Sequence, residues 1–335
     1  MSFRFGTTDG VSIVARQWMA QFRSFGFEVI TVTGDPDADR SVPGLAIGAA
    51  DAPTDGEVAA ALADVDLAVV ENLCTIPLNV PAALAVGRVL AGRPAVIHHH
   101  DPPWHRRRYA HVTELPLDDP AWRHVTITAT AAAEMAAHGI STTVIHNGFD
   151  PPAPGDRPGR RRDLDVAEDE LLLAHPVRAI ERKNVPAAVA LAQAMGATYW
   201  LLGPAEEGYG DELDRILGSA SCRVIHRPCD DVDDIYAAAD AVAYPSTWEG
   251  FGNPPIEAAL RRRPAAVGHY PFSEQLRALG MRFCEPDDAD GLARLARSAD
   301  PVWLDQNQRI AEHHFSIDRV RADLGALLAG AGWLP

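Results

Sequence analysis

Short apolar runs alternate with longer amphipathic stretches along the chain, which is the pattern of parallel sheets built from βαβ units. In the first half, the apolar runs predict six strands: Phe3–Gly6, Glu28–Val32, Leu67–Val70, Ala95–His99, Val125–Thr128 and Thr143–His146. The stretches between them predict helices, among them Val11–Phe25, Leu78–Leu90 and Ala129–Ala137. This half therefore has the pattern of an α/β domain.

The pattern is interrupted once and then starts again. Residues Asn147–Arg162 are rich in Pro, Gly and Arg and show little periodicity, so they predict a linker. Beyond them, five further strands are predicted at Leu171–His175, Tyr199–Leu202, Arg223–His226, Ala241–Tyr244 and Ala265–Val267. We therefore predict two doubly wound domains, residues 1–150 and 151–316. Because such sheets bind ligands at the carboxyl ends of their strands, two facing domains would form an interdomain cleft.

Composition narrows the class of protein. With 335 residues, the chain is long enough for two cores, and 47% hydrophobic with 23% charged residues is typical of a folded globular protein. The net charge of −16 argues against nucleic acid as a partner and against broad adhesion to anionic membranes, although weak peripheral contact stays open. We expect a cytoplasmic protein, since no secretory signal and no run of membrane-spanning length is evident. The oligomeric state is not constrained.

No metal site is expected from the cysteines or the acidic clusters. Cys74, Cys222, Cys229 and Cys284 are scattered without a CxxC pair, so neither zinc nor a disulfide framework is supported. The cluster Asp35–Asp39 lies in a Gly/Pro-rich turn and is interpreted as a solvated loop. The cluster Asp230–Asp234 precedes a short predicted helix at Ile235–Ala239, where carboxylates complement the helix dipole.

The richest stretch for chemistry is STWEGFGNPPIEAALRRRP, residues 246–264. It predicts a glycine-rich loop that runs into a helix, with Asn253 as N-cap and Pro254 at the first helical position. Glycines let backbone amides approach a ligand, and a helix N-terminus favours a phosphate. The carboxylates of Glu249 and Glu257 accept hydrogen bonds from hydroxyl groups. Together these features predict a nucleotide-sugar site.

This stretch resembles the E-x7-E signature of glycosyltransferase family 4. The resemblance implies an α/β protein of the GT-B fold, with two Rossmann-like doubly wound domains facing an interdomain cleft and the nucleotide-sugar donor held mainly by residues 151–316. It also implies that a C-terminal helix near Ile317–Leu328, within residues 317–335, returns to the first domain, which would then carry the acceptor side. The family's chemistry implies a retaining reaction with no cofactor and no metal.

The resemblance also implies roles for single residues. Arg178 and Lys183 match the pair that binds the donor diphosphate, although Asn184 follows the lysine where the family has glycine. Fixed cations there would stabilise the departing nucleoside diphosphate. The amides of Gly250, Phe251, Gly252 and Asn253 would hold the diphosphate and part of the sugar, Glu257 the ribose and Glu249 the sugar hydroxyls.

Three histidines end a predicted strand, followed by Asp101. Strand alternation puts His98 and His100 on one face and His99 on the other. The family has a histidine close to the donor here, and the His-Asp pair favours His100, but which of the three faces the cleft stays open. A metal bound by the triplet is the alternative; adjacent side chains diverge, and no further ligand is evident in the sequence.

Two further segments receive roles on the substrate side. Gly10, in the segment Thr8–Ser12, would approach the donor where many family members have a Gly-Gly loop; a simple helix start capped by Asp9 is the alternative. The basic run Arg106, Arg107 and Arg108 follows His100 and suggests a negatively charged acceptor. The other basic runs, Arg160–Arg162 and Arg261–Arg263, are interpreted as solvated surface.

The hypothesis is therefore a retaining, metal-independent transferase that moves a hexose-type sugar from a nucleoside diphosphate to an acceptor hydroxyl. A GT-B epimerase, a pseudo-glycosyltransferase and a non-catalytic glycan- or partner-binding relative are the alternatives. Neither the acceptor nor the donor is specified, and GDP-mannose, UDP-glucose and UDP-N-acetylglucosamine are all open.

Overall fold

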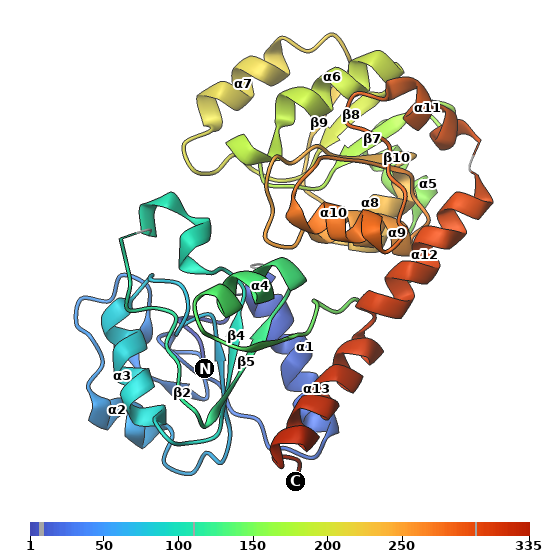
Figure 1. The fold of residues 1–335 in the computed structure, drawn as a ribbon. Coiled ribbons are helices and arrows are strands. Elements are labelled where there is room, and N and C mark those ends of the chain that lie inside the picture. The colour runs from blue at the N-terminus through green and yellow to red at the C-terminus, as the bar shows by residue number, and fades with distance from the viewer. Residues whose placement is uncertain (7–9, 110, 299) are drawn as a thin grey trace. The chain divides into compact units, whose positions relative to one another are not determined.

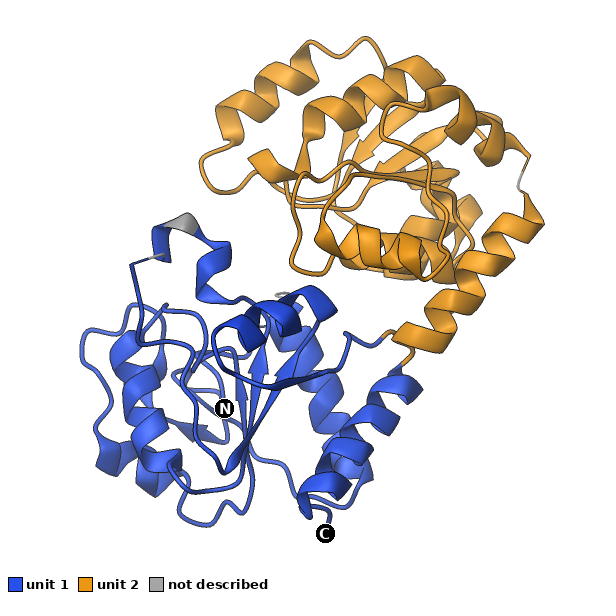
Figure 2. Ribbon diagram, viewed as in Figure 1, with its two compact units in different colours: residues 1–148, 317–335 blue, residues 149–316 orange. Residues whose placement is uncertain are grey.

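The chain divides into two compact units in the computed structural model (Figure 2). Unit 1 comprises Met1–Gly148 and Ile317–Pro335, and unit 2 comprises Phe149–Ser316. The structure describes residues 1–6, 10–109, 111–298 and 300–335, without the side chain of Arg107. The boundary falls at Gly148, where an added Cβ would lie 2.8 Å from Val320 Cγ2, so the chain passes closely against its own C-terminal helix.

Unit 2 contains a parallel five-stranded sheet in the order β11-β10-β7-β8-β9. In chain order this is 5-4-1-2-3, the arrangement of a doubly wound sheet, with its topological switch point between β7 and β10. In β7, β8 and β9 one predicted residue each lies outside the observed strand, and β10 and β11 match their predicted bounds. The strands are β7 (Leu172–His175), β8 (Thr198–Leu201), β9 (Val224–His226), β10 (Ala241–Tyr244) and β11 (Ala265–Val267).

The helices of unit 2 flank this sheet (Figure 1). Most begin at a side-chain cap or with proline in the first turn, as short helices between buried strands require. They are α5 (Arg157–Asp163), α6 (Val185–Met195), α7 (Gly210–Gly218), α8 (Val232–Ala238), α9 (Asn253–Leu260), α10 (Pro271–Ala278), α11 (Ala289–Arg297) and α12 (Pro301–Phe315), with a 3₁₀ turn, η4, at Glu181–Lys183.

Unit 1 contains a parallel four-stranded sheet in the order β3-β4-β5-β6 and a separate short pair, β1-β2. The strands are β1 (Val32–Thr33), β2 (Arg40–Ser41), β3 (Ala68–Glu71), β4 (Ala95–His99), β5 (Trp122–Thr126) and β6 (Thr142–Val144). The helices are α1 (Gly10–Ser24), α2 (Asp55–Ala61), α3 (Val80–Leu90), α4 (Ala129–Ala137) and α13 (Ile317–Ala331), with 3₁₀ turns η1 (Pro43–Leu45), η2 (Pro103–His105) and η3 (Arg107–Tyr109).

The C-terminal helix α13 packs in unit 1, against α1 and one face of the sheet. Trp18 and Phe22 of α1 share a buried cluster with Val320 and Leu324 of α13 and with Val96 of β4. Residues more than 290 positions apart in sequence thus complete one core, with the terminal helix lying beside the first helix (Figure 1).

The prediction was wrong for the first two strands. Phe3–Gly6 is not a strand, and pairing occurs earlier, at Met1–Phe3. Of the second predicted run, Glu28–Val32, only Val32 lies in β1. Glu71 N donates to Met1 O over 2.9 Å, and Ser2 N donates to Val32 O over 3.1 Å. The first residues therefore lie between β1 and β3, offset from the prediction toward the N-terminus.

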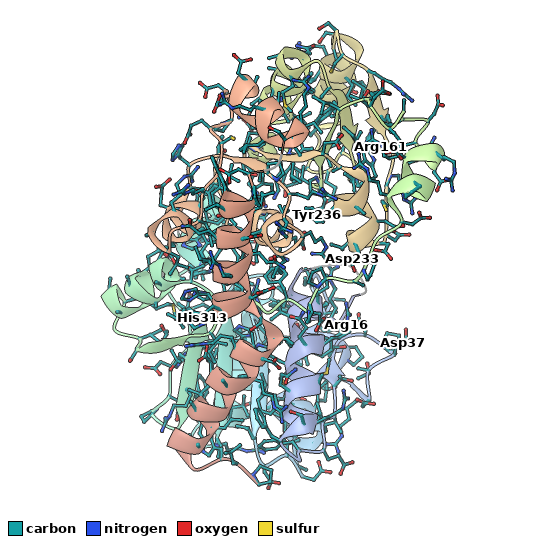
Figure 3. The ribbon with its side chains drawn as sticks, turned by 90° about the vertical axis from the view of Figure 1, so that its right-hand side faces the viewer. Arg16, Asp37, Arg161, Asp233, Tyr236 and His313 are labelled. Carbon is teal, nitrogen blue, oxygen red and sulfur yellow. The ribbon has the colours of Figure 1, made fainter. Side chains whose placement is uncertain are left out.

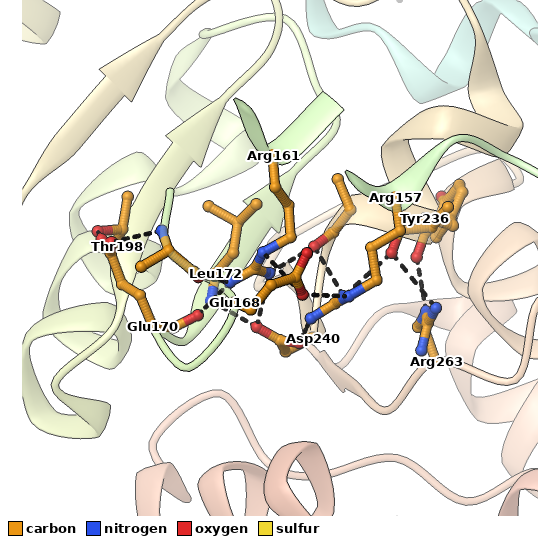
Figure 4. Close-up of polar contacts among 12 residues, drawn as sticks. Arg157, Arg161, Glu168, Glu170, Leu172, Thr198, Tyr236, Asp240 and Arg263 are labelled. Atoms are coloured by element: carbon orange, nitrogen blue, oxygen red, sulfur yellow. Dashed lines mark hydrogen bonds and ion pairs between the residues drawn. The ribbon is translucent and has the colours of Figure 1, made fainter. Parts of the chain in front are cut away.

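The predicted linker contains a helix, α5, and of its basic run Arg160–Arg162 only Arg162 is exposed. Arg161 is 1% exposed and donates to Ala238 O and to Asp240 Oδ2, while Arg157 pairs with Asp240 Oδ1 over 2.8 Å (Figure 4). Asp240 also accepts from Leu172 N, so it joins α5 to the starts of β7 and β10. Apolar periodicity could not reveal a short helix whose buried side chain is an arginine.

The acidic segment before α8 is structural, as predicted. Asp231 caps the helix by accepting from Asp234 N over 3.1 Å, and Asp233 pairs with Arg261 over 2.6 Å. Figure 3 shows Asp233 and Tyr236 on this helix. Arg261 is thereby tied down rather than solvated, which corrects the interpretation of the run Arg261–Arg263.

The other acidic cluster lies in a loop, also as predicted. Asp39 accepts from both the amide and the hydroxyl of Thr31 at 2.7 Å, and Asp37 lies exposed at the edge of unit 1 (Figure 3). All four cysteines are free thiols. Among the described residues, no helix is both long and apolar enough to cross a membrane.

Candidate functional site

The carboxyl ends of β7 and β10 lie at the topological switch point of unit 2, where doubly wound sheets bind ligands. The chain leaves β7 at His175 toward η4, which carries Arg182 and Lys183. It leaves β10 at Tyr244 toward the loop with Glu249. Thr247 N donates to Arg182 O over 2.9 Å, so the two loops are held together through the backbone.

Glu249 is paired with two cations. Its Oε1 lies 2.6 Å from Lys183 Nζ, and its Oε2 lies 2.5 Å from Arg182 NH1. Lys183 Nζ also donates to the hydroxyl of Tyr244 over 2.9 Å. The structure therefore brings together Glu249 and Lys183 of the predicted site and adds Arg182 and Tyr244, which sequence reasoning missed.

The ionisation of this cluster follows from its burial and its charges. Burial lowers the pKa of Lys183 to about 8, against the opposing attraction of Glu249. Burial by itself would raise the pKa of Glu249, but Lys183 and Arg182 outweigh it and hold that pKa below its usual range. Glu249 is thus an ionised, buried acceptor beside two cations, and the cluster is one positive charge in excess while Lys183 stays protonated.

The loop after Glu249 differs from prediction at its cap. Helix α9 begins at Asn253 with Gly252 as its N-cap, at φ +88°, and Asn253 makes no side-chain cap. An added Cβ at Gly252 would lie 2.8 Å from the Tyr270 hydroxyl, so glycine is needed both for the backbone and for the space. Because prolines occupy the second and third helical positions, only a few amides of this helix start can meet an anion.

Phe251 packs its ring in the core, whereas Glu257 keeps its carboxylate in a hydrogen bond. The Phe251 ring stacks on Phe272 with centroids 4.2 Å apart, so its side chain belongs to the core and any contact with a ligand would come from its backbone. Glu257 accepts from the Tyr236 hydroxyl over 2.8 Å, and burial raises its pKa.

Tyr270 offers a donor that the sequence did not single out. Its hydroxyl is buried beside Gly252 and has no hydrogen-bond partner among the described residues. Buried hydroxyls normally have one, which makes this group a candidate contact for a ligand at the glycine loop.

Arg178 lies in the open. Its side chain is 52% exposed and pairs with Glu206 over 2.6 Å. Exposed pairs of this kind contribute little to stability, so the guanidinium can exchange Glu206 for a stronger anion. Arg178 and the buried Lys183 are therefore in different environments, although both follow β7.

Unit 1 gathers a second polar cluster at the carboxyl ends of β3 and β4. Glu71 Oε2 lies 2.8 Å from His100 Nε2 and 2.9 Å from His98 Nδ1, and all three side chains are buried. Burial by itself would raise the pKa of Glu71, but the two imidazoles lower it; burial lowers the pKa of His98. Glu71 was missed because it belongs to a different strand from the histidines.

Backbone geometry fixes this turn. Asn72 adopts φ +60°, and its side-chain oxygen accepts from the amides of both His100 and Asp101 over 3.1 Å. His99 faces the other way, as strand alternation predicted: it bonds to Thr75 and to His124. Strand β4 ends at His99, so His100 comes directly after it. Of the three histidines, His100 therefore lies nearest the carboxyl edge of the sheet.

The three ligand atoms of Glu71, His98 and His100 lie within 4.8 Å of one another, which is close enough to hold a metal ion. The sequence argument against a metal rested partly on the lack of a further ligand, and Glu71 removes that part. The contact of His100 with Glu71 is a hydrogen bond, whereas neither ring nitrogen of His98 has a hydrogen-bond partner among the described residues.

The remaining predicted residues are less defined. Gly10 is the first residue of α1, and an added Cβ would meet nothing within 4 Å, so no close approach requires glycine there. Thr8 and Asp9 lie outside the described residues. Arg106 lies 3.5 Å from Asp101, and Arg108 stacks over Tyr109; Arg107 is described only by its backbone, in η3.

Comparison with known proteins identifies the class. Residues 182–298, which include Lys183, Glu249 and α9, match the family model of glycosyl transferases group 1. This match supports a glycosyltransferase of the GT4 type. The mannosylglucosylglycerate synthase of Thermotoga maritima is 23% identical to this glycosyltransferase, over 95% of its chain and 96% of the relative. The synthase of the same name from Petrotoga mobilis is 25% identical over 65% and 63%.

Solved structures confirm the GT-B fold. Anabaena HepE, solved with UDP-glucose, superposes on the glycosyltransferase with a TM-score of 0.72 at 20% identity and covers 98% of both chains. Sucrose-phosphate synthase from Thermosynechococcus elongatus gives a TM-score of 0.73 at 17% identity, over 96% and 94%.

Proposed function

We propose that the glycosyltransferase transfers a hexose from a nucleoside diphosphate to an acceptor hydroxyl with retention of anomeric configuration and without a metal ion. The observation that carries the proposal is the cluster of Glu249, Lys183 and Arg182 at the switch point of unit 2. It combines an ionised hydrogen-bond acceptor with two cations, which is what a sugar bearing a diphosphate requires.

The roles follow from each environment. Lys183 and the exposed Arg178 bind the diphosphate together with the amides around Gly252, and Glu249 accepts from sugar hydroxyls. Glu257 accepts from the ribose; its present partner, the hydroxyl of Tyr236, keeps its carboxylate oriented. The Tyr270 hydroxyl supplies a further hydrogen bond to the donor.

In the reaction, a bond forms between the acceptor oxygen and the anomeric carbon, and the bond from that carbon to the diphosphate oxygen breaks. The acceptor proton passes to the departing phosphate oxygen. The fixed cations stabilise the charge that develops there. His100, oriented by Glu71, hydrogen-bonds to the sugar during the transfer.

The acceptor we propose is an anion. Arg106 and Arg108 lie in the segment that follows His100, with Arg107 between them in sequence. The product named for the Thermotoga relative contains glycerate, which carries a carboxylate. Removing the charges of Arg106 and Arg108 should raise the acceptor KM about tenfold and leave the donor KM unchanged; equal effects on both would contradict this role.

The central test is a donor panel. UDP-, GDP-, dTDP- and ADP-sugars are incubated with the glycosyltransferase in EDTA, and slow hydrolysis and thermal stabilisation are measured. One donor at a hundred times its Kd should stabilise the protein by about 2.7 kcal/mol. Hydrolysis of that donor with retention, unchanged by EDTA, is the expected result. Absence of stabilisation by every nucleotide would refute the donor site, and inversion or EDTA sensitivity would refute the mechanism.

A further inference from the structure

Glu71, His98 and His100 bring three metal-ligating side chains together at the carboxyl ends of β3 and β4 in unit 1. One ligand atom of each lies within 4.8 Å of the other two, and all three side chains are buried. Strand pairing sets Glu71 directly opposite His98, and His100 comes two residues after His98, on the same face. The three groups, which we call the His–Glu cluster, therefore converge from two adjacent strands of one sheet.

Hydrogen bonding leaves this cluster partly unsatisfied. The contact of His100 Nε2 with Glu71 Oε2 is a hydrogen bond of 2.8 Å. His98 Nδ1 lies 2.9 Å from the same oxygen, yet neither ring nitrogen of His98 has a hydrogen-bond partner among the described residues, although its side chain is 0% exposed. Since buried polar side chains nearly always have such a partner, His98 points to a ligand that the chain itself does not supply.

The ligand set and its spacing fit a transition-metal ion. Two imidazoles and one carboxylate form the His₂Glu set of zinc sites in which a fourth position is left for water. Tetrahedral ligands at about 2.0–2.1 Å from zinc lie about 3.4 Å apart, so a displacement of the carboxylate by about half an ångström would open the cluster for an ion. Mg²⁺ and Ca²⁺ prefer oxygen ligands and fit this set less well.

Neighbouring groups hold the ligands in place. Trp18 of α1 stacks on the His98 ring, with centroids 3.9 Å apart and the ring planes at 16°. Asn72 accepts from the amides of His100 and Asp101 and thereby fixes the turn after β4. Ligands that are already held by packing and hydrogen bonds lose little freedom when an ion binds.

We infer that the His–Glu cluster binds one divalent transition-metal ion of the zinc type, through Glu71, His98 and His100, and that this ion inhibits sugar transfer. Metal-independent catalysis and a metal-binding inhibitory site are compatible, because the ion occupies a residue that the reaction uses. The inhibition rests on the proposed function, in which His100 hydrogen-bonds to the sugar.

Inhibition follows from what the ion does to His100. In the neutral imidazole, Nε2 donates to the Glu71 carboxylate, and Nδ1 is left as an acceptor. A metal ion at Nε2 leaves the ring proton on Nδ1, which then can only donate. The ion also places positive charge beside a sugar that becomes oxocarbenium-like as its bond to the diphosphate breaks.

The binding test uses Co²⁺, whose visible absorption reports its coordination. The full chain is stripped of metal with EDTA, desalted and titrated with Co²⁺ alone. We expect the visible bands of four-coordinate Co²⁺, with an end point at one ion per chain. Zn²⁺ should remove these bands, because such sites bind it more tightly than Co²⁺.

Two variants locate the ion. His98→Phe keeps an aromatic ring beside Trp18 and should weaken Co²⁺ binding about 100-fold. His269→Gln is the matched control in unit 2 and should leave the titration unchanged. His269 also contacts two carboxylates, Glu274 and Glu285, but through its two different ring nitrogens, so the three groups do not converge on one point.

A further readout does not depend on the folding of a ligand variant. Because Trp18 stacks on His98, Co²⁺ bound to the wild-type chain should quench tryptophan fluorescence. Trp18→Phe should lose most of this quenching and keep the Co²⁺ bands.

The inhibition test uses the donor found in the panel. Zn²⁺ added to the end point should lower turnover about fivefold or more, and EDTA should restore it. The same Zn²⁺ concentration should leave the turnover of His98→Phe unchanged from its own metal-free value. Absence of the four-coordinate bands, equal Co²⁺ binding by His98→Phe, or undiminished turnover with the ion bound would overturn the inference. Failure of the donor panel would leave the Co²⁺ spectra intact, so the two proposals fail separately.

Discussion

Glu249 and Glu71 are both buried carboxylates at the carboxyl edge of a parallel sheet, yet they are compensated differently. Glu249 lies between Lys183 and Arg182, with contacts of 2.6 and 2.5 Å. Glu71 lies between His98 and His100, at 2.9 and 2.8 Å. The first carboxylate is held by two cations and the second by two imidazoles.

The difference suggests a division of labour. In the proposed donor site, Lys183 and Arg182 would supply the fixed positive charge that a donor diphosphate needs. The cluster of unit 1 keeps histidines oriented without a fixed positive charge, which suits a group that hydrogen-bonds to a sugar. Four predictions test this difference between the two carboxylates.

The largest effect is expected at Glu249. Glu249→Gln should lower kcat about 100-fold or more, because it removes the acceptor for sugar hydroxyls and leaves two cations without their carboxylate. The measurement is kcat with the donor found in the panel, at a temperature where unfolding is excluded by fluorescence. Glu206→Gln, at the exposed partner of Arg178, is the control and should change kcat less than twofold. Near-native turnover of Glu249→Gln would remove Glu249 from the site.

Lowering the pH below 6.5 should destabilise unit 1 more than unit 2. Burial lowers the pKa of four imidazoles of unit 1, namely His98, His99, His124 and His146. Below pH 6.5 the unfolded chain takes up protons before the folded one, so stability falls by up to about 1.4 kcal/mol per pH unit and histidine. In unit 2, burial lowers the pKa of His175 to about 3, whereas Glu274 and Glu285 raise that of His269, so their effects oppose each other.

Hydrogen exchange of peptides from each unit, corrected for intrinsic rates, would measure this between pH 6.5 and 5. His98→Phe should flatten the dependence of unit 1, and His175→Phe should act on unit 2 alone. An equal pH dependence of hydrogen exchange in the two units would contradict this prediction.

Raising the pH above 8 should lower the activity through Lys183, which lies in unit 2. Because the pKa of Lys183 is about 8 in the ligand-free protein, kcat/KM for the donor should fall about tenfold per pH unit above pH 8. Arginine keeps its charge at this pH, so Lys183→Arg should move the fall of kcat/KM beyond pH 9, at a lower maximal rate. If kcat/KM of Lys183→Arg still fell above pH 8, the titrating group would be one other than Lys183.

The smallest effect is expected at Arg178. Arg178→Met should raise the donor KM about fivefold to tenfold and change Tm by less than about 1 °C, since the exposed pair with Glu206 stabilises the fold little. Donor titrations and thermal unfolding measure the two effects. Arg162→Met, at an exposed arginine of α5, is the matched control and should change neither. An unchanged donor KM in Arg178→Met would exclude Arg178 from the donor site.

Much of the fold was predictable because its signals are local. The bounds of β4, β10, β11 and α4 follow from the sequence, since buried parallel strands are short apolar runs between turn signals. The first strand was misplaced by about two residues, and α5 was missed. Both errors concern segments whose partners are remote in sequence, such as Val69 for Met1 and Asp240 for Arg161.

The residues of the candidate site also separate into those that a local motif predicts and those that only strand pairing brings together. Glu249 and Lys183 were predicted from motifs, and their 2.6 Å contact brings the two motifs together. Arg182 lies beside Lys183 in sequence, but no pattern distinguished it from Arg178, which is exposed. Glu71 and Tyr270 have no motif, because their proximity to His100 and Gly252 arises only when the strands pair.

The sequence by itself determined the class of fold, the order of strands and helices, and the loops that carry charge, because these depend on periodicity and on residue chemistry within short windows. Only the tertiary structure decided which charges compensate one another and which basic residues are buried. Those outcomes depend on burial and on distances between segments far apart in the chain, and a local pattern contains neither.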